Sequence, residues 1–207
     1  MVRVSCFNHT INLVIKDGIE TSTDLSAIMK KVTAITSASH QSLFFAEKLN
    51  ETFKLSIPKP VITRWNTHFT CFQRISKLDR DKLNNILIEC GYSNLCLSVI
   101  NTEKIIEFVD IMQGFNEASI KNQAQNKPNL SLVTTCVALL HKHLNVYRST
   151  VKHLKKLIDV LLNSLTQRFF GIFINLNICD KTRINPKYVC ILMYILSIIN
   201  LNFYFKN

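Results

Sequence analysis

The sequence predicts a mainly α-helical protein, an array of about six to eight helices preceded by one short strand. Only four Gly and four Pro interrupt the 207 residues, and 47% of the residues are hydrophobic. Apolar residues recur at three- and four-residue spacing through most of the chain, which is the period of an α-helix. The exception is residues 2–5, "VRVS", where β-branched and polar residues alternate as they do in a strand.

Each expected helix combines an apolar face with a start or stop signal. Gly18 is placed to end the first helix, and Thr23 or Asp24 can cap the second. Pro58 and Pro60 impose an extended crossing before the fourth, whose start is expected at Asn66. The expected ranges are 6–17, 25–35, 43–53, 67–78, 81–90, 101–120, 130–147 and 149–170.

Charge and cysteine usage narrow the class of partner and compartment. The formal net charge of +11 favours polyanionic partners, either nucleic acid or an acidic membrane surface. Seven cysteines without a CxxC pair argue against a secreted disulfide framework and for a reducing compartment. The first residues show no apolar core and no small-residue cleavage site, so no signal peptide is expected.

The last part of the chain differs from the rest. Residues 188–205 form an uncharged stretch at the lower edge of bilayer-spanning length, with basic residues before it. Asn200 and Asn202 interrupt the stretch. Membrane insertion is therefore kept only as an alternative, and a membrane partner is not expected.

A zinc site is one hypothesis for the cysteines and histidines. Cys6 and His9 share a helix face at i, i+3, and His68 and Cys71 repeat this spacing in reverse. Four such ligands could form a tetrahedral site, but a separation of about sixty residues is unlike compact zinc modules. The alternative is a buried cysteine with a hydrogen-bonded histidine at a helix start.

No catalytic constellation can be identified from the residues. Glu103, Glu107 and Asp110 lie on one helix face, where a single carboxylate stripe is usually solvent-exposed. His141 and His143 point about 200° apart on a helix, so they cannot share a metal, and we interpret them as a surface feature. The chain has no Gly-rich phosphate loop and no Ser/His/Asp set.

Two segments are candidates for nucleic-acid contact. Lys152, Lys155 and Lys156 form a basic helical stretch that could follow a phosphate backbone, although such a run can equally be a solvated face. Arg64 and Trp65 place a guanidinium beside the only indole of the chain. An indole can stack on an unpaired base while the guanidinium holds a phosphate, or it can fill the seam between two helices.

Two motifs resemble a known family. The segment "CFNHTINLVIKDGI", residues 6–19, is similar to the C-x-x-H-x-L-N-L segment of hAT-superfamily transposases and their domesticated BED-type zinc-finger relatives. Asn12 and Leu13 match that pattern, and Ile11 replaces its first leucine. About fifty residues later, residues 63–66 match the first four positions of the family's "TRWNS". The resemblance extends in order over about residues 2–175.

The resemblance implies a ribonuclease-H-like core interrupted by a long helical insertion. Residues 1–22 would be a remnant of that core, residues 23–175 the insertion domain, and residues 176–207 a divergent hydrophobic tail. The family's catalytic Asp, Asp and Glu, which bind divalent metal, are expected to lie outside this chain. The resemblance therefore implies no enzyme activity, no cofactor, and no copy of the family's dimerisation segment.

The resemblance also implies roles for particular residues. In the family the tryptophan helps to stabilise a base flipped out of the DNA end, so Arg64, Trp65 and Asn66 are the expected DNA contacts. Cys6 and His9 would be structural residues near the former active site. We therefore expect a non-catalytic, nuclear, DNA-binding fragment of a hAT-type transposase. The alternatives are a helical protein-interaction scaffold without DNA contact and a tail-anchored membrane protein.

Overall fold

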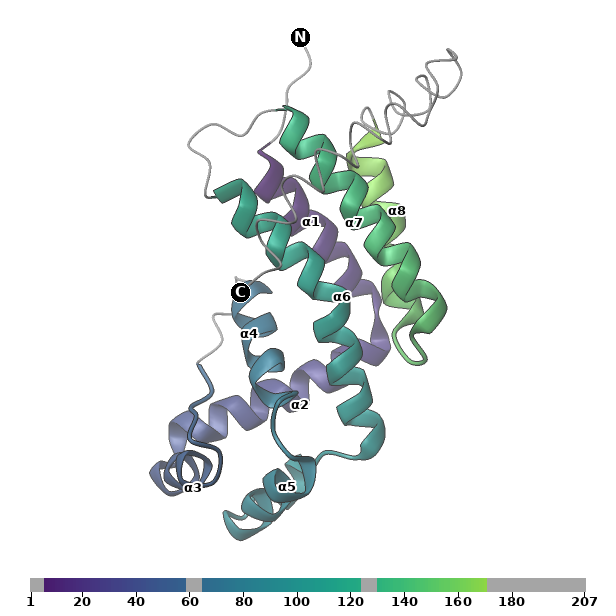
Figure 1. Ribbon diagram of the computed structural model, residues 1–207. Helices are drawn as coiled ribbons and strands as arrows, with labels where there is room; N and C mark the ends of the chain where they lie inside the picture. The colour runs from purple at the N-terminus through teal and green to yellow at the C-terminus, as the bar shows by residue number, and fades with distance from the viewer. Residues whose placement is uncertain (1–5, 59–64, 124–129, 171–207) are drawn as a thin grey trace, which may run out of the picture.

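A computed structural model describes residues 6–58, 65–123 and 130–170. This part of the chain folds into eight α-helices and one short 3-10 helix, as shown in Figure 1. The elements are α1 (Phe7–Thr21), α2 (Thr23–Gln41), α3 (Leu43–Phe53), α4 (Trp65–Ile75), α5 (Arg80–Glu89), η1 (Ser93–Leu95), α6 (Val99–Gln123), α7 (Leu130–Thr150) and α8 (Lys155–Arg168).

The helices form two adjoining groups. In Figure 1, α1, α6, α7 and α8 lie side by side, and α1 packs along α8 while α7 contacts both α6 and α8. Helix α2 crosses beneath this group, and it packs against α3 and α4. Helices α3 and α5 contact each other at the far end of the molecule. The long α6 connects the two groups because it contacts α1, α2, α4 and α7.

A single hydrophobic core runs through both groups. Phe72 of α4 packs against Phe108 of α6 with ring centroids 4.4 Å apart, and both side chains are fully buried. Burial of one such side chain contributes about 1.5–3 kcal/mol. This contact fixes α4 on α6, and it thereby fixes the position at which α4 begins.

The mainly α-helical fold class is confirmed for the described residues, none of which forms a strand. The expected strand at residues 2–5 and the hydrophobic tail at 188–205 lie outside them. Within the described part, none of the helices has the length and apolar character needed to cross a membrane. The domain limits at residues 22 and 175 stay predictions.

Gly18 has a different role from the predicted one. Helix α1 continues through it to Thr21, and Gly18 is buried where α1 crosses α8. A Cβ atom at this position would lie 2.7 Å from Leu161 Cδ2 and 3.1 Å from Leu157 Cδ1. The glycine therefore permits two helices to approach closely and does not stop one.

Two helix boundaries also differ from the expected ones. Helix α2 continues through the Ser/His-rich stretch because Thr36, Ala38 and Ser39 face the interior and are buried. The last described helix starts at Lys155, since residues 151–154 form the turn between α7 and α8. In both places, the helix boundary depends on contacts with other helices, which the local sequence does not show.

Candidate nucleic-acid interface

Trp65 is the first residue of α4 and joins this helix to α1. Its indole Nε1–H donates a hydrogen bond to Asn12 Oδ1 at 2.8 Å. The ring packs at a tilt against Phe69, with centroids 6.3 Å apart, and it lies against the edge of the core. The side chain remains partly exposed. Trp65 is therefore a half-buried seam residue that still presents part of its surface to solvent.

The start of α4 is held by short-range contacts around the proline segment. Cys71 Sγ donates to the carbonyl oxygen of Pro58 at 3.2 Å, and Thr70 Oγ1 donates to the carbonyl of Asn66 at 2.8 Å. Burial raises the pKa of the Cys71 thiol, so it stays protonated as a donor. Arg64, predicted to hold a phosphate beside Trp65, lies outside the described residues.

Two further amide groups lie next to the Trp65–Asn12 hydrogen bond in the sequence. Asn66 follows Trp65, and Asn8 lies one helical turn before Asn12 on the same face of α1. The Oδ1 atoms of Asn8 and Asn66 are both buried without a hydrogen-bond partner. Buried unpaired acceptors are uncommon in folded proteins and cost about 1–3 kcal/mol each. No group in the described part of the chain therefore accounts for these two acceptors at the start of α1 and of α4.

Cys6 and His9 are both exposed at the start of α1. The expectation of a buried cysteine at this point is therefore wrong for Cys6. Cys6, His9, His68 and Cys71 all lie in the described part of the chain, and no group of three side chains that could hold a metal ion is found there. Their structural role near a former active site stays a prediction.

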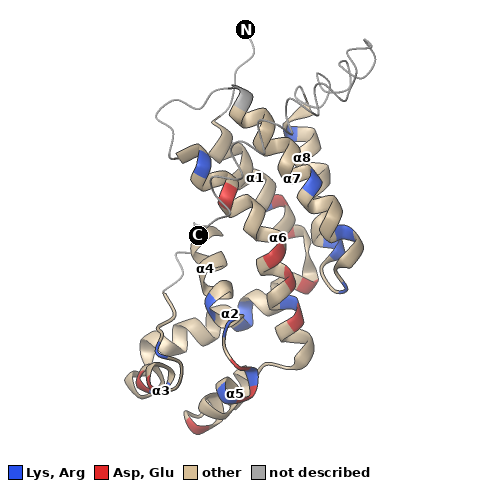
Figure 2. Ribbon diagram, viewed as in Figure 1, with Lys and Arg blue, Asp and Glu red and all other residues tan. Residues whose placement is uncertain are grey.

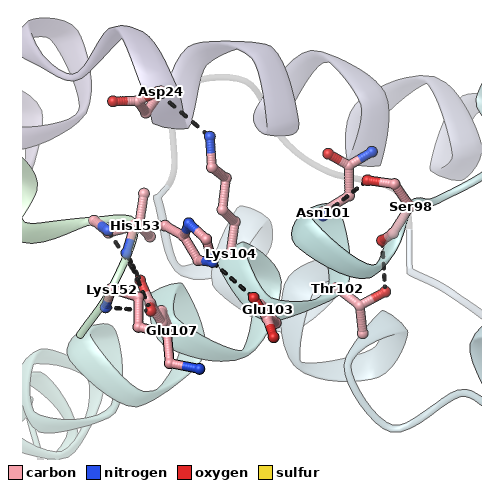
Figure 3. A network of polar contacts seen from close by, with 10 residues as sticks. Asp24, Ser98, Asn101, Thr102, Glu103, Lys104, Glu107, Lys152 and His153 are labelled. Atoms are coloured by element: carbon pink, nitrogen blue, oxygen red, sulfur yellow. Dashed lines mark hydrogen bonds and ion pairs between the residues drawn. The ribbon is translucent and has the colours of Figure 1, made fainter. Parts of the chain in front are cut away.

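Of the three candidate lysines, Lys152 lies in the turn between α7 and α8, and Lys155 and Lys156 are the first two residues of α8. All three are exposed. The turn itself is held on α6 by the Glu107 carboxylate, as Figure 3 shows. This carboxylate accepts hydrogen bonds from the backbone N–H groups of residues 152, 153 and 154, at 2.7, 3.0 and 2.9 Å respectively.

A second carboxylate of α6 reinforces this turn. Glu103 Oε2 lies 2.7 Å from His153 Nε2 (Figure 3). The hydrogen bond from His153, together with the charge of nearby Lys152, lowers the pKa of Glu103. Asp110, by contrast, has a raised pKa because it is partly buried. The three residues are therefore not the uniform, solvent-exposed stripe that the sequence predicted.

His143 also differs from the prediction, which made it a surface feature. Its Nε2 lies 3.1 Å from the carbonyl oxygens of both Asp110 and Ile111, and its ring covers Gly114. A Cβ atom on Gly114 would lie 3.0 Å from the ring. His143 thus fixes α7 on α6, and Nε2 must carry the proton to donate to either carbonyl.

The structure does not bring the two candidate DNA-binding segments together. Trp65 reaches α1 through Asn12, whereas the turn with Lys152 reaches α6 through Glu107. Figure 2 shows the basic turn between α7 and α8 on the opposite side of the view from the start of α4. DNA that contacts one segment meets a different surface of the molecule from DNA that contacts the other.

The described residues do not fit the divalent metal that the family resemblance implies. No group of three carboxylate, His or Cys side chains forms among them. The carboxylates closest to such a role are already engaged: Glu107 with three N–H groups, Glu103 with His153, and Asp17 with Ser164 and Arg168. These carboxylates hold helices together.

Sequence reasoning missed two residues that shape these surfaces. Asn12 was identified only as a motif match, and Glu107 only as part of a carboxylate stripe. Each acts across more than forty residues of sequence, Asn12 on Trp65 and Glu107 on the turn before α8. No local pattern signals such a pairing. The only sequence signal was that Asn12 and Trp65 both lie in family-like motifs.

Comparisons with known proteins confirm the family resemblance. Residues 4–98 match the family model of the ZBED1 RNase-like helical domain. The chain is also similar to zinc finger BED domain-containing protein 4 of Homo sapiens, with 22% identity over 191 residues, which cover 89% of this chain. The match covers 16% of that protein, so the chain spans about a sixth of the relative's length. Residues 4–98 are therefore similar to a helical domain found in BED-related proteins, as the resemblance implied.

Proposed function

From this relation to transposase-derived, BED-related proteins, we propose that the chain binds DNA in the nucleus and does so without catalysing strand transfer. The specific contact is the α1–α4 junction, the place where Trp65 of α4 is hydrogen-bonded to Asn12 of α1. There Trp65 stacks on an unpaired base, and its neighbours in sequence, Arg64 and Asn66, also contact the DNA. The turn between α7 and α8 is a second, purely electrostatic contact.

The observation that carries the proposal is the hydrogen bond between Trp65 Nε1 and Asn12 Oδ1. It joins the two motifs on which the family resemblance rests, although they lie 53 residues apart in sequence. Both residues also lie inside the range matched by the family model. A partly exposed aromatic ring in a fixed orientation is the type of surface on which an unpaired base can stack.

Charge supports the second contact. The net charge of +11 attracts a polyanion at long range, and Lys152, Lys155 and Lys156 present three exposed ammonium groups at the turn and at the start of α8. Because Glu107 already accepts from the backbone N–H groups of residues 152–154, a phosphate at these residues would meet side chains and not the backbone. This contact carries no sequence information.

The non-catalytic part of the proposal rests on the roles of the described carboxylates. Glu103, Glu107 and Asp17 are each bound to donors of a neighbouring helix or turn, which leaves them in structural roles. Two-metal strand transfer needs carboxylates that clamp two ions around the reacting oxygens. Incubation of the chain with DNA ends and Mg²⁺ or Mn²⁺ should yield no nicked or joined product.

A direct test is fluorescence anisotropy with two labelled DNA hairpins, one fully paired and one carrying a single unpaired base. Wild-type protein should prefer the hairpin with the unpaired base. Trp65→Ala should weaken binding to it about 5- to 100-fold, the range expected for removal of one stacked base. Binding to the paired hairpin should change by about twofold or less, because phosphate contacts remain.

Phe44→Ala is a matched control, because it removes an exposed aromatic ring from α3, away from the proposed contact. It should leave binding to both hairpins unchanged. Equal affinity of Trp65→Ala and wild-type protein for the unpaired hairpin would reject the stacking role. A fluorescent fusion of the chain tests the compartment: exclusion from the nucleus would contradict the proposal.

A helical protein-interaction scaffold is the second candidate function. Leu43 and Phe44 are consecutive apolar residues at the start of α3, 76% and 53% exposed, and an exposed apolar patch can be a protein-interaction site. If the chain binds neither hairpin at physiological salt, this candidate replaces DNA binding.

A further inference from the structure

We propose that Asn12 is the positioning residue of the Trp65 indole: its side-chain oxygen sets the orientation in which the ring meets an unpaired base. This inference rests on the proposed DNA-binding function, and it goes beyond that function by giving Asn12 a role of its own. It makes α1 part of the DNA-binding site, although α1 supplies no stacking ring.

The geometry isolates Asn12 as the orienting group. An indole has one hydrogen-bond donor, Nε1–H, and in Trp65 this donor is taken by Asn12 Oδ1 at 2.8 Å. The other defined contact of the ring is Phe69, whose centroid lies 6.3 Å away at an interplanar angle of 56°. Packing against Phe69 limits how deep the indole lies, whereas the directional hydrogen bond limits its rotation.

Asn12 itself is well placed for this role. Its side chain is exposed, whereas its neighbour Ile11 is fully buried in the core and holds the backbone of α1 in place. Asp17, one to two turns further along α1, accepts hydrogen bonds from Ser164 and Arg168 at 2.6 and 2.8 Å, which locks α1 to α8. Asn12 therefore offers its oxygen from a fixed helix.

Two other asparagines lie near this hydrogen bond in the sequence, Asn8 one turn before Asn12 and Asn66 directly after Trp65. Asn8 Oδ1 and Asn66 Oδ1 have no partner, yet the indole N–H is bonded to Asn12 and to neither of them. The choice of acceptor fixes the direction of the N–H bond, which lies in the plane of the ring, and it thereby limits the orientations that the ring can take. Substitution of Asn12 should therefore release the Trp65 indole, and this release changes the ring's surroundings.

The chain contains one tryptophan, so its intrinsic fluorescence reports this ring directly. The test compares wild type, Asn12→Ala, Asn12→Asp and the control Asn163→Ala, which truncates an exposed asparagine of α8. In free protein, Asn12→Ala should shift the Trp65 emission maximum and raise its acrylamide quenching. Asn12→Asp retains an oxygen acceptor and should stay close to wild type, as should Asn163→Ala.

Binding to the two hairpins provides the second measurement. Asn12→Ala should weaken binding to the hairpin with an unpaired base by roughly three- to tenfold, the effect of removing one hydrogen bond. It should leave binding to the paired hairpin and the circular dichroism spectrum unchanged. A merely structural role would instead lower stability and weaken binding to both hairpins alike.

The two proposals fail in different ways. Asn12→Ala with unchanged Trp65 emission, quenching and hairpin preference overturns the positioning role, even where wild-type protein binds the unpaired base. Wild-type protein that shows no hairpin preference overturns the stacking function and, with it, the DNA role of Asn12. In that case a change of Trp65 emission in Asn12→Ala would show only that Asn12 orients the ring.

Discussion

The α1–α4 junction and the α7–α8 turn are both candidate DNA contacts, and they differ in which part of the chain is held in place. The junction fixes one aromatic side chain by a side-chain hydrogen bond, Trp65 to Asn12, and leaves neighbouring amide oxygens unpaired. The backbone of the turn is held by the Glu107 carboxylate of α6, and the lysine side chains at the turn and at the start of α8 are exposed. The first can distinguish one DNA shape from another, whereas the second can only attract a phosphate backbone.

The extent of the family model separates the same two regions. The family model covers residues 4–98, which include Asn12 and Trp65 and end before α6. The three candidate lysines lie beyond that range, and their proposed role rests on charge alone. The junction is therefore the better supported of the two candidate contacts.

The seam between α1 and α8 supports both regions, since α1 carries Asn12 and α8 begins at the basic turn. Gly18→Val should lower the free energy of unfolding by about 2–3 kcal/mol, because the added side chain overlaps Leu161 in a filled core. Urea unfolding followed by circular dichroism measures the decrease. Glu20→Val, at an exposed site of the same helix, controls for the helix propensity of valine. Equal decreases in both variants would contradict close packing at Gly18.

Glu107→Ala should destabilise the turn between α7 and α8 and leave the Trp65–Asn12 contact unchanged. Removal of the carboxylate leaves three backbone N–H groups without their acceptor, at a cost of about 1–3 kcal/mol. Glu89→Ala removes a carboxylate from an exposed ion pair and should cost less than about 1 kcal/mol. Thermal unfolding checks the difference, and Trp65 emission should be unchanged in both variants.

Replacement of the three candidate lysines by alanine should weaken binding to both DNA hairpins equally. The slope of log affinity against log salt should become shallower by roughly 2 to 3, since each phosphate that a lysine neutralises adds about 0.9 to it. Anisotropy titrations at several salt concentrations measure the slope. Weaker binding of the hairpin with the unpaired base alone would show that the turn, and not the junction, reads DNA shape.

Low pH should weaken the contact between Asp17 of α1 and α8, and it should change the stability least among these perturbations. The hydrogen bond from Ser164, and then the Arg168 guanidinium, lower the pKa of Asp17 below its usual 3.8. The stability that Asp17 contributes is therefore fully present above about pH 4 and is lost as the pH falls through the lowered pKa. The stability difference between wild type and Asp17→Asn should be constant from pH 7 to about pH 4 and shrink below it. A difference that grew on acidification would contradict this anchoring.

The fold could be predicted from the sequence wherever local signals decide a helix. The expected helix at residues 43–53 coincides with α3, and the helix expected to stop at Gly91 is α5, after which Gly91 takes a positive φ of 79°. Gly18 was misread because a buried glycine and a helix-ending glycine look alike in sequence. Only the crossing of α1 and α8 distinguishes them.

The candidate site was predicted in part for the same reason. The prolines and the Asn-Thr pair placed a helix start beside Trp65, and α4 begins there. The partner of the indole could not be found, since the hydrogen bond to Asn12 depends on how α1 and α4 pack across 53 residues. His143 was misplaced on the surface because no pattern in α7 shows that it faces the carbonyls of α6.

DNA recognition at the α1–α4 junction is tested most directly by the fluorescence of Trp65 during a DNA titration. Trp65 is the only tryptophan, so no other indole contributes to this emission. The hairpin with an unpaired base should quench the emission in step with binding, and the paired hairpin should leave it nearly unchanged. Tight binding of the unpaired hairpin with no change in Trp65 emission would contradict recognition at this junction.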